Sequence, residues 1–426
     1  MTATDHQQRD KRDLVRGSIM SIGGFLMRMA SRVPFLFIAG QLYGTARYGD
    51  YVLATALIES AAVLGTFGFK LTLFKFLHDE TRQPEEVVRH VLAVTLTLAL
   101  VLAVSLWALA LPLARLFDMP DAGPKIAVIA WATPVMVMSD ILLAATWAKR
   151  IVHFEVIARS LIEPATLTCA SFLFFKHGFP EMGLPVAYLT AFTFAAIASV
   201  YFFSRCYSLA TLFGGGLRLD YIRELLRQSA STSLHDVIGL LFTKIDVLVV
   251  GYFFGNTAVG LYGMAQQFLT VVEKITLSFS PVLIPVLTEA LKSRDIPRAR
   301  HQLFAVGRRI LMMQAPVVLL FLVAGPFLLS MIGPGFRDAW GILMVLTIGA
   351  WANGALGLSE FALLSIRPHA NPQASVLRLA LYGALVMPFQ ALLGPIGVAL
   401  SNILATLAAN FMRTLVCRPA LRAIAP

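Results

Sequence analysis

Long apolar runs alternate along the chain with short polar segments that carry most of its charges. A membrane-spanning helix needs about 20 predominantly apolar residues, and about twelve stretches of this kind can be recognised. They cover residues 17–41, 51–76, 88–111, 125–148, 157–175, 185–204, 233–253, 259–288, 303–330, 339–364, 374–393 and 395–415. The pattern predicts an all-α integral membrane protein of about twelve transmembrane helices.

The composition agrees with this pattern. The chain is 58% hydrophobic and 14% charged, whereas a soluble protein has roughly a quarter of charged residues. The first apolar run is too long for a signal peptide and carries charges, so we expect it to stay as the first span. The three cysteines, Cys169, Cys206 and Cys417, form no CxxC and have no histidine at metal spacing, so neither a disulfide framework nor a metal site is expected.

The basic residues predict how the chain is oriented. The net charge is +11, and with a cytoplasmic N-terminus the Lys and Arg residues divide about five to one in favour of the cytoplasmic side. The predicted outer loops hold only Arg47, Arg115, Lys125, Lys176 and Arg337. We therefore expect an even number of spans in the bacterial inner membrane, with both termini cytoplasmic, and no nucleic-acid partner.

An internal repeat divides the chain into halves. Shifting the sequence by about 211 residues places Gly44, Gly49 and Tyr51 on Gly255, Gly260 and Tyr262. Six spans separate the copies, so both halves point the same way across the membrane. The repeat predicts two parallel six-helix bundles, at residues 1–204 and 233–426, joined by an amphipathic helix over 205–232 on the cytoplasmic membrane face.

No motif of an enzyme or of a nucleotide-driven pump is present. The chain lacks GxxxxGK[ST], HExxH and GxSxG. We therefore expect no enzymatic activity and no cofactor, and a transporter of this kind would run on an ion gradient or downhill.

Cations within the spans are the first candidates for a substrate site, because each is costly in the bilayer unless it is sheltered. Arg28 and Arg32 lie four residues apart on one face of the first span, and Lys244 lies one position from the repeat equivalent of Arg32. With Lys274 they predict a cationic cavity for a diphosphate or another polyanion. The alternatives are an Arg32–Glu59 ion pair and neutralisation of Lys244 by Asp246 or Glu273.

Acids within the spans are candidates for ion coupling: Glu59, Asp140, Asp246 and Glu360. Asp140 and Glu360 are related by the repeat, and either could instead bind water near the interface. Arg159 and Glu163 lie four residues apart and are expected to form a structural pair, and Lys70 is expected to extend to the headgroups.

Short glycine and aromatic motifs resemble those of a known family. Residues 42–51, LYGTARYGDY, look like the first outer turn of polysaccharide flippases, and residues 65–69, GTFGF, look like the glycine pair on their second span. Residues 246–255, followed by Val259, Gly260, Leu261 and Tyr262, are similar to their span 7–8 signature. On these motifs the chain is identified as a member of the lipid-linked oligosaccharide (O-antigen type) flippase branch of the MOP superfamily, which also contains the MATE-like multidrug exporters.

The resemblance implies a two-lobed, V-shaped transporter that works by alternating access. It implies movement of an undecaprenyl-diphosphate-linked oligosaccharide to the periplasmic leaflet, with membrane lipids, and glycan polymerase and glycosyltransferases, as partners. A cation-coupled multidrug exporter is the alternative, but it would need an acidic cavity rather than Arg28 and Arg32. The flippases of the peptidoglycan precursor usually have more spans and a longer chain, so we expect a poorer match to them.

Overall fold

The computed structural model describes residues 27, 30–78, 82–149, 151, 153–292, 296–358 and 370–424, and all regular structure within these ranges is helical. The chain divides into two compact units, Met1–Leu248 and Val249–Pro426. The boundary falls inside one long helix, α11 (Leu219–Lys292), and not at a loop.

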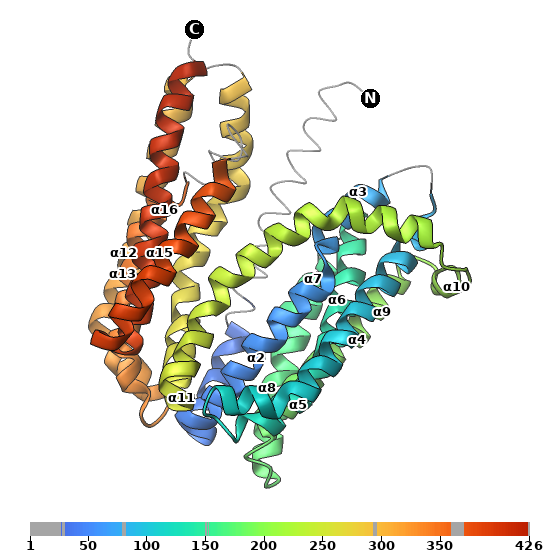
Figure 1. Cartoon of the computed structure of the whole chain (residues 1–426), viewed down its shortest axis with the longest axis horizontal. Coiled ribbons are helices and arrows are strands. Elements are labelled where there is room, and N and C mark those ends of the chain that lie inside the picture. The colour runs from blue at the N-terminus through green and yellow to red at the C-terminus, as the bar shows by residue number, and fades with distance from the viewer. Residues whose placement is uncertain are drawn as a thin grey trace. The chain divides into compact units, whose positions relative to one another are not determined.

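The first unit begins with a helix from Ala30 that ends in a π-helical turn, η1 (Ala39–Tyr43). In it, α2 packs against α4, α5 and α6, and α9 packs against α6 and α8 (Figure 1). The remaining elements of this unit, before α11, are α2 (Gly44–Thr66), α3 (Phe69–Leu77), α4 (Pro84–Leu116), α5 (Ala122–Ala130), α6 (Ala132–Ala148), α7 (His153–Ile157), the π-helical turn η2 (Ala158–Ile162), α8 (Glu163–Lys176), α9 (Gly183–Ser204) and α10 (Leu209–Phe213).

Within its described residues, the second unit holds the later part of α11 and four further long helices. In it, α16 packs against α13 and α15, and α12 packs against α13 (Figure 1). The elements are α12 (Ile296–Ile332), the 3-10 turn η3 (Phe336–Ala339), α13 (Trp340–Leu356), α15 (Ala370–Leu393) and α16 (Pro395–Ile424).

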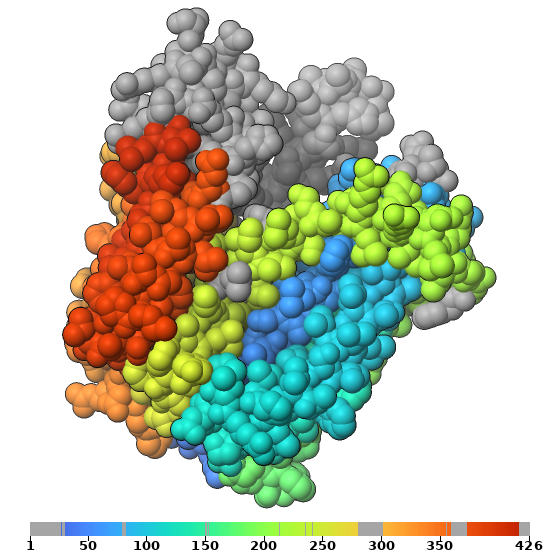
Figure 2. Space-filling view, in the orientation of Figure 1, coloured from blue at the N-terminus to red at the C-terminus, as the bar shows by residue number. Residues whose placement is uncertain are grey.

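Helix α4 shows which surface faces lipid. Its small residues Ala99, Ala103 and Ala110 are buried against other helices, as is common where membrane helices approach closely. Several of its large apolar side chains are exposed, and Figure 2 shows the blue-to-cyan atoms of this part of the chain at the surface. An exposed apolar face of this length requires a lipid environment, and it includes Val101, Val104, Trp107 and Leu111.

Two glycines resolve the number of spans. Among the described residues, nine helical stretches are long and apolar enough to cross a membrane, and two of them, Ala30–Leu77 and Phe242–Phe279, contain Gly44 and Gly255. The rings of Phe35 and Tyr51, on either side of Gly44, lie 5.7 Å apart, whereas one straight helix would separate them by about 24 Å. Dividing both stretches at their glycine and adding α13, which has 17 residues, gives the expected twelve spans.

The repeat predicted from the sequence is visible in these same glycines. Gly44 has φ 77° and ψ 178°, and its repeat equivalent Gly255 has φ 73° and ψ −170°. This backbone conformation is open essentially to glycine alone. Two equivalent positions, far apart in the sequence, therefore interrupt their helices in the same way.

Two local features differ from the prediction. The second span, expected to be continuous over 51–76, breaks after Thr66, where Phe67 and Gly68 both adopt left-handed conformations. A Cβ atom on Gly68 would lie 2.6 Å from the backbone nitrogen of Ser233, so close packing of α11 against this break requires glycine. The linker also differs from one helix over 205–232, because the described chain forms the short α10 and then enters α11 at Leu219.

Candidate functional site

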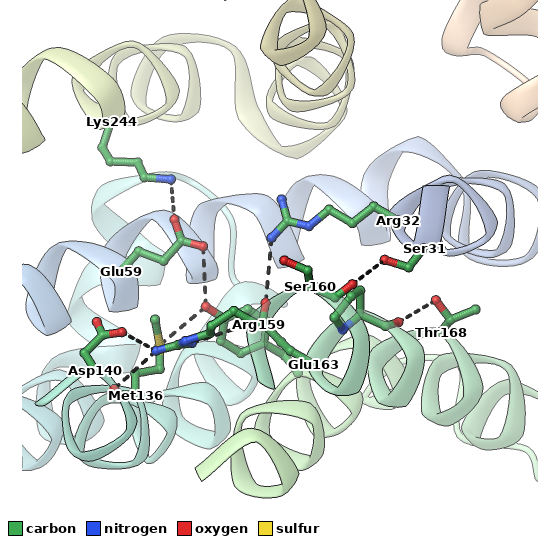
Figure 3. Close-up of polar contacts among 12 residues, drawn as sticks. Ser31, Arg32, Glu59, Met136, Asp140, Arg159, Ser160, Glu163, Thr168 and Lys244 are labelled. Carbon is green, nitrogen blue, oxygen red and sulfur yellow. Dashed lines mark hydrogen bonds and ion pairs between the residues drawn. The ribbon is translucent and has the colours of Figure 1, made fainter. Parts of the chain in front are cut away.

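Seven of the charged residues of the predicted spans lie close together inside the first unit, and Figure 3 shows most of them. Arg159 lies at the centre, in the π-helical turn η2, a type of distortion that is frequent at functional sites. Its guanidinium forms an ion pair with Asp140 of α6 and another, of 3.2 Å, with Glu163 of α8. The sequence prediction of an Arg159–Glu163 pair is confirmed, while Asp140 proves to be a second partner of the same arginine.

Two further cations extend this cluster. Arg32 approaches Glu163 at 3.7 Å, and Lys70 of α3 approaches Asp140 at 3.5 Å. The turn η2 is fixed to the first helix as well, because the hydroxyl of Ser31 donates a hydrogen bond of 3.0 Å to the carbonyl of Ser160. Lys70 therefore contacts a carboxylate, whereas the sequence predicted that it extends to the headgroups.

A second ion pair lies beside the cluster. Lys244 of α11 pairs with Glu59 of α2, 185 residues away in the sequence, and the hydroxyl of Tyr188 donates to the other oxygen of Glu59 at 3.4 Å. The predicted alternative of an Arg32–Glu59 ion pair is wrong. Arg32 forms an ion pair with Glu163, and Glu59 forms an ion pair with Lys244 (Figure 3). The packing of α11 against α2 decides this pairing, and the sequence contains no local signal for it.

Together these residues form a charge network, which we define as Arg32, Lys70, Arg159, Lys244, Glu59, Asp140 and Glu163. It contains four cations and three carboxylates, so its formal charge is +1. Its middle is buried, since the side chains of Arg159 and Glu163 are 10% and 9% exposed. Arg32, at 41%, and Lys244, at 28%, are more accessible. The arrangement can therefore offer accessible cations, held by a buried centre, to an anionic ligand.

The other predicted site residues lie elsewhere. Asp246 is buried on α11 of the first unit, whereas Lys274 lies on the part of α11 that belongs to the second unit. Arg28 and Glu360 are outside the described residues. Tyr188 was not predicted as a site residue, because a tyrosine within an apolar span gives no distinct sequence signal.

A separate ion cluster at the other end of α2 was also missed. Lys125, predicted as an outer-side residue, is buried and pairs with Asp50 at 2.5 Å and with Glu181 at 3.7 Å. Arg47 pairs with the same Glu181 at 2.5 Å. The hydrogen bond from Arg47 lowers the pKa of Glu181, which lies between two spans. The cluster ties the start of α2 to α5 and to the α8–α9 loop.

Comparison with known sequences gives a family and two relatives. The family model described as polysaccharide biosynthesis protein matches residues 14–291. The succinoglycan biosynthesis transport protein ExoT of Rhizobium meliloti is 23% identical over 82% of this chain and 67% of its own length. The uncharacterized membrane protein EpsK of Bacillus subtilis is 26% identical over 38% of this chain and 32% of its own length.

Comparison with solved structures shows the fold. The lipid II flippase MurJ in an inward closed conformation is similar with a TM-score of 0.78 and 14% identity, over 95% of this chain and 89% of that one. An inward-facing multidrug resistance MATE family transporter of the MOP superfamily is similar with a TM-score of 0.71 and 13% identity, over 93% of each chain. The chain thus has the fold shared by these two kinds of transporter.

Proposed function

The chain belongs to the polysaccharide biosynthesis protein family, and from this premise we propose that it is a flippase that moves a lipid-linked oligosaccharide across the membrane by alternating access. The relative ExoT, a succinoglycan biosynthesis transport protein, supports a polysaccharide substrate. We place the protein in the bacterial inner membrane with both termini cytoplasmic, because of the positive-inside distribution of Lys and Arg.

The charge network is the observation that carries the choice of substrate class. Its excess of one positive charge, with Arg32 and Lys244 as the accessible cations, is complementary to a diphosphate linking a glycan to its lipid carrier. We propose Arg28 and Lys274 as further substrate-binding cations. Several dispersed cations allow binding without preventing release, since no single contact holds the whole ligand.

We propose an ion gradient as the energy source, with carboxylates in the spans as coupling sites. Glu59 and Asp140 lie in the charge network, where each contacts a cation that could alternate between the acid and the cargo. Asp246 and Glu360 are the other two candidates. Residues 1–204 and 233–426 would form the two moving bundles, and residues 205–232 would join them.

A cation-coupled multidrug exporter is the second candidate, since a MATE family transporter has a similar fold. That activity would need an acidic cavity for cationic drugs, whereas the accessible groups of the charge network are mainly cations. The family membership and the sign of this charge both favour the polysaccharide flippase.

The test in cells is deletion of the gene followed by complementation. We expect deletion to abolish surface glycan and to accumulate lipid-linked oligosaccharide in the inner membrane. The wild-type chain should restore export, and Arg32→Ala should not, although its abundance in the membrane stays normal. Unchanged surface glycan with increased sensitivity to cationic drugs would instead support the multidrug exporter.

A further inference from the structure

The Lys244–Glu59 pair is more exposed than the two most buried ion pairs of the first unit, Lys125–Asp50 and Arg159–Glu163. Both partners are accessible, since the side chain of Lys244 is 28% exposed and that of Glu59 is 36% exposed. In the Lys125–Asp50 and Arg159–Glu163 pairs, no side chain exceeds 10%. Among the described residues, the Lys244–Glu59 pair is therefore one in which an incoming anion can reach the cation without unpacking the helices.

The chemistry of the pair allows its partners to be exchanged. The ammonium group of Lys244 is a compact charge on a flexible stem, so it can turn from one anion to another by changing rotamer. Arg159, by contrast, is held by Asp140 and Glu163 at the same time. Exchange at Lys244 thus costs little reorganisation, whereas exchange at Arg159 would disrupt two contacts.

The surroundings of Glu59 lower the energetic cost of its losing Lys244. Its second oxygen accepts a hydrogen bond from Tyr188, and Arg32 is close enough to act on it electrostatically. A carboxylate without these neighbours would be costly to leave without its lysine. Glu59 therefore keeps a hydrogen-bond donor and a nearby positive charge when Lys244 moves away.

From this geometry we propose that Glu59 acts as an internal competitor that occupies Lys244 in the empty protein and must be displaced by the diphosphate of the cargo. This inference rests on the proposed function and adds a specificity role to an acidic residue of its site. Each binding event gives up the Lys244–Glu59 contact, and each release restores it. Glu59 thus weakens binding of the diphosphate and speeds its release.

The test measures binding of farnesyl diphosphate, a short prenyl diphosphate, to the purified full-length chain in detergent micelles, with inorganic diphosphate as a competitor. Glu59→Gln keeps the shape of the side chain and an oxygen for Tyr188 but removes the competing charge. We expect it to bind the probe about fivefold more tightly, the factor that corresponds to about 1 kcal/mol for a partly exposed ion pair. In a vesicle assay with lipid-linked oligosaccharide, the same variant should turn over more slowly, because release becomes limiting.

Two controls identify the cause of the effect. Glu181→Gln removes the same charge from the separate ion cluster of Arg47, Asp50, Lys125 and Glu181, and it should leave binding unchanged. Lys244→Met should weaken binding of the probe. Adding Glu59→Gln to it should have no further effect, because the lysine for which Glu59 and the diphosphate compete is then absent. If Glu59→Gln does not fold, Glu59→Asp, whose shorter side chain loosens the pair, should show a smaller gain in affinity.

The outcomes separate this inference from its premise. Tighter binding by the Glu59 variant that requires Lys244 supports the competition. Equal or weaker binding by a folded Glu59 variant, while the wild type binds the probe, overturns the competition and leaves the proposed function intact. Absence of binding by the wild type overturns the cationic site of the proposed function, and the competition with it.

Discussion

At the scale of single residues, the charge network combines groups that hold the helices together with groups that remain available to a ligand. Arg159 belongs to the first kind, because it joins α6 and α8 through two carboxylates in a largely buried position. Arg32 belongs to the second kind, because it touches one carboxylate at 3.7 Å and is 41% exposed. Both arginines lie within predicted spans, but they should respond differently to the same substitution.

We expect Arg159→Ala to destabilise the protein by about 3–5 kcal/mol, because it leaves the buried Glu163 and the partly buried Asp140 without their shared cation. Arg32→Ala should cost less than about 1 kcal/mol, as is usual for an accessible pair. Unfolding of the purified variants in mixed micelles measures both values. Equal losses in the two variants would show that Arg32 is as structural as Arg159.

The ion cluster of Arg47, Asp50, Lys125 and Glu181 gives a prediction about pH. The pKa of Glu181 is lowered in the folded protein by Arg47, so the contribution of this pair to stability is present above the unfolded pKa and is lost as the pH falls through the lowered value. Glu181→Gln should therefore unfold with a weaker dependence on pH between about 5 and 3 than the wild type. Identical acid unfolding curves would show that the pair contributes nothing to folding stability.

The sequence predicted some members of these clusters but few of their partners. Arg159 and Glu163 could be paired because four residues on a helix place two side chains on one face. Glu59 and Lys244 could not, because their contact depends on how α2 and α11 pack, and each has other charges nearer in the sequence. Charged residues in a span indicate that a partner is needed, but only the packing of the helices shows which one it is.

At the scale of elements, glycines determine where the long helices divide. A Cβ atom at Gly44 or Gly255 would meet no atom within 4 Å, so glycine is needed there for its backbone conformation and not for space. At Gly68 glycine is needed for both reasons. Its φ is positive, and a Cβ atom would lie 2.6 Å from the backbone nitrogen of Ser233 of α11. The repeat and the turn at Gly44 were predictable from residue spacing, whereas the break at Gly68 depends on a contact with a distant helix.

We expect Gly44→Ala and Gly255→Ala each to destabilise the protein by about 1–3 kcal/mol, the cost of a side chain in this backbone conformation. Gly239→Ala and Gly383→Ala are matched controls, since these glycines are helical and also have no atom within 4 Å of a Cβ position. The controls should be neutral or stabilising by up to about 1 kcal/mol. Thermal unfolding in micelles gives the comparison, and losses at the control positions similar to those at Gly44 and Gly255 would contradict the conformational explanation.

At the scale of the whole molecule, the sequence predicted an all-helical membrane protein of a polysaccharide flippase family. The family model shows the polysaccharide biosynthesis protein family, and the solved structures show the fold. Hydropathy is sufficient to predict a helical membrane protein, because only helices and closed barrels can satisfy the backbone within lipid. The expected poorer match to peptidoglycan-precursor flippases was wrong at the level of fold, since MurJ is similar over 95% of the chain. The longer chain and additional spans of those flippases therefore did not predict how similar the two folds are.

The orientation across the membrane can be tested with single cysteines in a variant that lacks Cys169, Cys206 and Cys417. We expect His177→Cys, in the α8–α9 loop, to react with a membrane-impermeant maleimide added to intact spheroplasts. Gly216→Cys, between α10 and α11, should react only after lysis, because the linker is rich in arginine and is predicted to be cytoplasmic. The opposite labelling pattern would invert the predicted topology.

Whether the protein moves a lipid-diphosphate-linked glycan can be measured by transport with the purified chain in vesicles. Vesicles would contain a fluorescent undecaprenyl-diphosphate oligosaccharide, and an enzyme added outside would report how much of the glycan becomes accessible with time. We predict protein-dependent translocation that Arg32→Ala abolishes and that Arg32→Lys partly retains, because the charge remains while the forked geometry is lost. Failure of the wild type to move this lipid, or full transport by Arg32→Ala at equal protein content, would contradict the account.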